Sequence, residues 1–153
     1  MKKIAVIIFI CYCFASLHSQ NNKPISLTWH TNFEEAKLIA HSQNKHILIY
    51  FTGSDRSIPC NMLNNDFFNT ERFKKIADKH LVLLKIYNPR RPGIVSRFQQ
   101  DKNLEISRKY KQRVHPTVVL TDADGNQIGA VESYNYLHDT SKYYLLINKA
   151  IKN

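Results

Sequence analysis

The sequence predicts an α/β fold, a three-layer α/β/α sandwich around a mixed sheet. Two continuous apolar runs, 46–51 and 81–87, have the pattern of strands that are buried on both faces. Helical periodicity separates these runs, and such alternation requires right-handed crossovers and a parallel core. A turn signal at 122–125, between two short apolar runs, predicts that an antiparallel hairpin closes the sheet.

The first strand and helix can be placed from periodicity and capping. Apolar residues recur at every second position of 25–30, which favours a strand. Thr31 or Asn32 is expected to cap the helix that follows. Glu34 and Glu35 fall in its first turn, where the helix dipole stabilises acidic side chains.

The remaining elements follow from the same two periodicities. We expect, in chain order, strand 46–51, a polar turn 52–60 that enters a helix, helix 70–79, strand 81–87, a long basic loop 88–101, helix 103–111, strand 118–120, strand 127–131 and a last helix 138–151. The loop contains Arg90, Arg91 and Arg97, which are interpreted either as solvated side chains or as contacts for an acidic partner.

The first twenty residues have the layout of a secretory signal peptide. Lys2 and Lys3 form the charged part, residues 4–14 an apolar part too short to span a bilayer comfortably, and 15–20 a more polar end. The alternative is a retained N-terminal anchor. We expect residues 1–20 to be the leader and residues 21–153 to form one domain that is secreted across the inner membrane.

Removal of the leader would leave one cysteine. Cys11 and Cys13 lie within it, so only Cys60 remains in the expected mature chain. Secretion implies an oxidising compartment, in which an unpaired thiol needs an explanation. Cys60 is then a buried inert thiol, a partner in an intermolecular disulfide, or a reactive group.

The charge balance favours acidic partners without naming one. The net charge is +10 for the whole chain and +8 without Lys2 and Lys3, which attracts anionic groups at long range. No recognisable nucleic-acid module accompanies this charge, so nucleic-acid binding is not expected. His41 and His46 lie five residues apart across a helix end and share no helix face. No metal site is therefore predicted. We also expect no cofactor, and no membrane contact once the leader is removed.

The turn after the second strand carries the most specific pattern. Phe51-Thr52-Gly53-Ser54-Asp55 is followed by Arg56 and by Ser57-Ile58-Pro59-Cys60, and further on come Val114-His115-Pro116-Thr117 and Asp122-Ala123-Asp124-Gly125. With these segments the chain resembles the thioredoxin superfamily, and more narrowly the secreted bacterial thioredoxin-family proteins. The resemblance covers about residues 27–151. It implies a thioredoxin-like sandwich with a Cys-x-x-Cys site, here reduced to Ser-x-x-Cys.

The departure from the family motif removes its chemistry. Disulfide exchange begins when a thiolate attacks a disulfide sulfur, and a second thiol then resolves the mixed disulfide. Ser57 stands where the family has its attacking cysteine, and a serine hydroxyl cannot perform that attack. A dithiol cycle is therefore excluded. Ser57 is expected instead to cap the helix by accepting an amide hydrogen bond, and Pro59 is tolerated in the first turn.

Two functions remain open at this point. The resemblance implies a cis peptide before Pro116, beside which main-chain groups pair with an extended client. The first function is therefore binding of a peptide or protein at a groove formed by Ser57, Cys60, His115 and Pro116, with Arg56 alongside. The alternative is a single-thiol oxidoreductase that works through Cys60. Burial would raise the pKa of this thiol and Arg56 would lower it, so the sequence alone does not decide between them.

Overall fold

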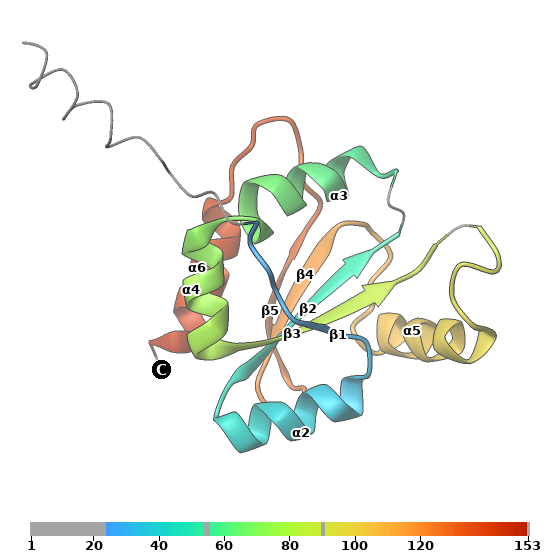
Figure 1. The fold of residues 1–153 in the computed structure, drawn as a ribbon, viewed down its shortest axis with the longest axis horizontal. Helices are drawn as coiled ribbons and strands as arrows, with labels where there is room; N and C mark the ends of the chain where they lie inside the picture. Colours follow the sequence, from blue (N-terminus) through green and yellow to red (C-terminus); the bar gives the residue numbers. More distant parts are fainter. Residues whose placement is uncertain (1–23, 54–55, 90, 153) are drawn as a thin grey trace, which may run out of the picture.

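The structure, a computed structural model, describes residues 24–53, 56–89 and 91–152 (Figure 1). The expected leader, and with it Cys11 and Cys13, lies outside the described residues, as do Ser54, Asp55 and Arg90. Five strands form one mixed sheet in the order β1-β3-β2-β4-β5. The strands are β1 (Trp29–His30), β2 (His46–Thr52), β3 (Leu81–Tyr87), β4 (Thr117–Thr121) and β5 (Gln127–Glu132).

The sheet combines a parallel half with an antiparallel half, as the sequence predicted. β3 is parallel to both β1 and β2, whereas β4 is antiparallel to β2 and to β5. The central strand β2 is buried along nearly its whole length. The hairpin between β4 and β5 turns at Gly125, whose φ is 84°. A Cβ atom at Gly125 would lie 2.7 Å from the Phe33 ring, so the turn requires glycine.

Helices cover both faces of the sheet and complete the three-layer sandwich (Figure 1). One face packs against α2 (Phe33–Gln43) and α5 (Arg97–Lys109). The other packs against α3 (Ile58–Leu63), a π-helical turn η1 (Asn64–Phe68), α4 (Glu71–His80) and α6 (Ser141–Ile151). The fold class predicted from the sequence is confirmed.

Three predicted boundaries are wrong by three residues or more. The last helix begins at Ser141 rather than at residue 138. The expected first strand 25–30 is only two residues long, because β1 lies at the sheet edge and pairs only with Leu83 and Leu84. The helix expected at 103–111 begins at Arg97, so its first two turns were taken for loop. Ser96 caps this helix, and its side chain accepts a hydrogen bond from the Gln99 amide at 3.1 Å.

The π-helical turn η1 was not expected from the sequence. It continues α3 and brings two consecutive aromatic residues, Phe67 and Phe68, into the core, with exposures of 0% and 2%. In a regular α-helix neighbouring residues point about 100° apart, whereas a π-turn adds one residue and changes their direction. The Phe67 ring contacts four other aromatic rings, those of Phe68, Phe73, Tyr143 and Tyr144, with centroids 4.7–5.1 Å away.

Candidate functional site

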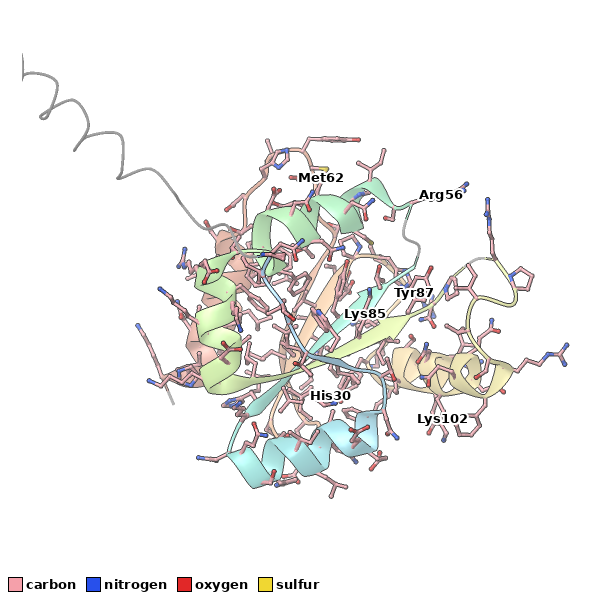
Figure 2. The ribbon with its side chains drawn as sticks, viewed as in Figure 1. His30, Arg56, Met62, Lys85, Tyr87 and Lys102 are labelled. Atoms are coloured by element: carbon pink, nitrogen blue, oxygen red, sulfur yellow. The ribbon has the colours of Figure 1, made fainter. Side chains whose placement is uncertain are left out.

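The motif residues lie at the carboxyl end of the central strands. Thr52 ends β2 and is the register partner of Tyr87 in β3, and the Asn88 amide donates to the Thr52 carbonyl at 2.8 Å. β4 begins opposite this end, since Phe51 pairs with Thr117. Figure 2 shows Arg56 at the start of α3 and Tyr87 at the end of β3, at this same edge of the sheet. The fold therefore gathers the start of α3 and the residues before β4 in one place.

Gly53 allows the turn after β2 to pack closely against His115 and Asn88. A Cβ atom at Gly53 would lie 3.3 Å from the His115 ring and 3.7 Å from the Asn88 carbonyl oxygen. A side chain here would push on the imidazole, so glycine lets the turn after β2 pack beside His115. Three chain segments far apart in the sequence thus meet around Gly53. Asn88 belongs to this group but was not among the predicted site residues, although a polar residue directly after a buried strand could have pointed to it.

Ser57 occupies the N-cap position of α3, but its side chain does not cap the helix. The residue has extended backbone angles (φ −73°, ψ 110°) and makes no side-chain capping hydrogen bond. The expected role is therefore wrong, and Pro59 explains part of the reason. A cap normally accepts from the second or third helical amide, and Pro59 at the second position has no N–H. Ser57 is half-buried and Arg56 is exposed, so both are accessible at this end of α3.

Cys60 lies inside the protein. Its exposure is 1%, and the Tyr50 hydroxyl donates to its carbonyl oxygen at 3.4 Å. Burial, together with the proximity of Cys60, raises the pKa of both Tyr50 and Tyr143 far above the ordinary value. The surroundings of the sulfur are thus apolar and phenolic, a setting typical of inert structural cysteines. Of the three alternatives for Cys60, the geometry favours the buried thiol.

The segment before β4 has a defined backbone conformation. The His115–Pro116 peptide bond is cis, Pro116 is buried, and His115 is half-buried. The Thr117 hydroxyl donates to the Val114 carbonyl at 2.8 Å, and the Pro116 carbonyl accepts from the Ser133 amide at 2.8 Å. These bonds hold the segment in place from both sides.

A polar cluster fixes the chain that follows β5. The Asp66 carboxylate in η1 accepts from the Tyr134 hydroxyl at 2.8 Å and lies 2.6 Å from His138 Nδ1. Partial desolvation raises the pKa of Asp66, but the hydrogen bonds and the charge of His138 outweigh it and lower the pKa below its ordinary value. The Tyr143 hydroxyl adds a bond to the Ser133 carbonyl at 2.8 Å. Residues 133–138 therefore connect η1 to Pro116. No sequence motif predicts this connection.

Within residues 24–53, 56–89 and 91–152, no three His, Cys, Asp or Glu side chains gather as a metal site would need. Over the same ranges, every helix is too short or too polar to cross a bilayer.

The accessibility of Cys60 can be tested directly. We expect iodoacetamide to label Cys60 in the native protein at least about a hundred times more slowly than in urea, because a thiol that is fully buried reacts only through opening of the structure. Peptide mapping by mass spectrometry separates Cys60 from Cys11 and Cys13. Native labelling as fast as that of a free cysteine peptide would show that the thiol is exposed.

The fold and the site define a thioredoxin-fold protein, with Cys60 the one cysteine among the described residues. A family model described as thioredoxin-like matches residues 28–123. The chain therefore belongs to the thioredoxin-like family, as the sequence motifs indicated.

Two curated relatives come from Chlamydia pneumoniae. The chain is 30% identical over 114 residues to the disulfide bond reductase DsbH, an alignment that covers 71% of this chain and 66% of DsbH. It is 25% identical over 117 residues to the thioredoxin-related protein DsbJ, covering 76% of this chain and 33% of DsbJ. The chain thus matches slightly less than two thirds of one relative and a third of the other.

Solved structures share the fold. A structure described as DsbH oxidoreductase superposes with a TM-score of 0.73 at 24% identity, covering 92% of this chain and 98% of that one. A thioredoxin from Thermus thermophilus superposes with a TM-score of 0.63 at 14% identity, over 83% and 88% of the two chains. At these identities the likeness establishes the thioredoxin-like architecture alone.

Proposed function

We propose that this protein is an extracytoplasmic thioredoxin-family binding protein that holds an extended peptide or a protein partner without a dithiol cycle. The client would lie across Ser57, His115 and the backbone at Pro116, with Arg56 at its side and Cys60 buried beneath it. The observation that carries the proposal is a serine at the accessible motif position above a cysteine that is 1% exposed. Binding needs neither residue to exchange disulfides, whereas catalysis needs a thiolate at the surface.

The relatives support a role in the handling of disulfide-bonded or thiol-bearing proteins. One carries the name disulfide bond reductase and the other thioredoxin-related protein. In this chain such a role would be limited to recognition of a client, since Ser57 replaces the attacking cysteine of the family. The leader pattern supports secretion, and the family resemblance supports a bacterial periplasm. The net charge of +8 that remains without Lys2 and Lys3 favours acidic clients.

The alternative, a single-thiol oxidoreductase acting through Cys60, fits the structure less well. It requires an accessible thiol, and Cys60 is enclosed beside two buried tyrosines, Tyr50 and Tyr143. A mixed disulfide would place a second sulfur and its chain in this closely packed region. A trapped Cys60 adduct with glutathione, formed by the native protein, would favour this alternative over binding.

Replacement of Pro116 tests the binding function. We expect Pro116→Ala to weaken the binding of extended peptides about tenfold, because proline fixes the backbone φ beside the client and alanine does not. Isothermal titration with unstructured peptides measures the effect, and circular dichroism checks that the variant is folded. Pro24→Ala, at an exposed proline outside the site, is the matched control. Unchanged affinity in a folded Pro116→Ala variant would contradict the proposed site.

A further inference from the structure

The chain between β3 and the first turn of α5 carries exposed cations and exposed apolar side chains together. Arg91 and Arg97 are exposed, and neither has an ion pair among the described residues. Ile94 and Phe98 have exposures of 52% and 73%. We call residues 91–98 the basic segment. It projects beyond the end of the sheet in Figure 1.

The cations and the exposed apolar side chains of the basic segment do not stabilise the folded core. Arg97 lies in the first turn of α5, which has no acidic residue, although the helix dipole disfavours a cation there. Phe98 stays outside the core, and a Cβ atom at Gly93 would meet no other atom within 4 Å. The sequence has no Asp or Glu from residue 79 to residue 100, and the nearest acidic residue, Asp101, forms no ion pair with Arg97 among the described residues.

The basic segment is held beside the candidate site at both ends. At one end, Asn88 bonds through its amide to Thr52 and through its side chain to the Ser107 hydroxyl at 2.9 Å. At the other end, the buried Asn103 side chain donates to the Tyr87 carbonyl at 2.7 Å and accepts from Gln99 at 2.8 Å. These bonds join the segment to the residues that surround Gly53 and His115, and such anchoring lowers the ordering cost of binding.

We infer that the basic segment is a specificity surface that recognises acidic residues next to an apolar side chain in an extended client. This inference rests on the proposed function, and it names the class of client that the site takes. Arg91 and Arg97 would pair with client carboxylates, for which the arginine fork is well suited. Ile94 and Phe98 would cover an apolar client side chain. The basic segment lies beside the candidate site, and this position favours a peptide as its ligand. An anionic membrane could bind cations on any face of the protein.

The test compares two fluorescent extended peptides that are identical except that every Glu in one is Gln in the other. With the whole chain at low salt, we expect about tenfold tighter binding of the acidic peptide. The preference should shrink as the ionic strength rises, because the Debye length falls to about 10 Å at 0.1 M. The double variant Arg91→Gln/Arg97→Gln should lose the preference and keep the affinity for the neutral peptide. Phe98→Ser should weaken both peptides, and Lys149→Gln, an exposed cation on α6, should change neither.

Each outcome separates the inference from the function on which it rests. Equal affinity for both peptides would overturn the specificity surface and leave the proposed function standing. Binding of neither peptide would contradict the proposed function itself. A preference that survives the double variant would place the recognition elsewhere. Arginine-dependent binding to phosphatidylglycerol vesicles, with no preference between the peptides, would contradict peptide recognition. It would show that the basic segment binds an anionic membrane.

Discussion

Ser57→Cys is expected to give the protein a disulfide reductase activity with two thiols in the motif. The substitution restores a thiol at the accessible start of α3, where the helix dipole stabilises a thiolate. Ser57 is already held at the start of the first helical turn, since the Asn61 amide donates to the Ser57 carbonyl at 3.0 Å. With dithiothreitol as reductant, insulin reduction should exceed that of the unchanged protein at least about tenfold.

The control for this experiment is the double variant Ser57→Cys/Cys60→Ala. It has the attacking thiol but no resolving thiol, so it should accumulate mixed disulfides rather than turn over. Mass spectrometry after mild oxidation should show an internal disulfide in Ser57→Cys and not in the double variant. If Ser57→Cys forms this disulfide and still reduces nothing, residues beyond position 57 have also lost their catalytic function.

Phe67→Ala is expected to produce the largest loss of stability. Phe67 is fully buried and stands at the centre of four aromatic rings. Its truncation removes these contacts and leaves a cavity, which costs about 3–5 kcal/mol of unfolding free energy. Urea denaturation followed by fluorescence or circular dichroism measures the change.

An exposed apolar residue provides the matched control for Phe67. Leu145 on α6 is 68% exposed, so Leu145→Ala should change the unfolding free energy by less than about 0.5 kcal/mol. A cost below about 1 kcal/mol for Phe67→Ala would mean that the core beneath η1 closes around the missing ring.

The sequence predicted the sheet well because its central strands are continuous apolar runs that have no polar face. It failed at the start of α5 for a physical reason. In the missed turns, residues 97–102, the one apolar side chain, Phe98, is exposed, and Gln99 is held instead by hydrogen bonds to the Asn103 side chain and the Thr31 carbonyl. Hydrophobic periodicity cannot detect such turns. The π-helical turn was also missed, because its extra residue is stabilised by tertiary packing of Phe67 and Phe68 rather than by local propensity.

The candidate site was only partly predictable. Ser57, Cys60, His115 and Pro116 come from segments with a recognisable pattern, and the structure places these segments at one end of the sheet. The capping role given to Ser57 was wrong, in part because a proline occupies the second helical position. Ser133 was not found because it reaches Pro116 through its backbone amide, which any residue but proline could supply.

The enclosure of Cys60 has a consequence for how the protein would operate in its compartment. A thioredoxin that cycles between dithiol and disulfide depends on a supply of electrons, and its active fraction follows the local reduction potential. Here the Cys60 side chain is buried, and position 57, where the family has the attacking cysteine, carries a serine hydroxyl. On the proposed function, the fraction of protein with a bound client is then set by mass action, through client concentration and affinity. Such a protein would work equally well in oxidising and reducing surroundings and would need no regenerating enzyme.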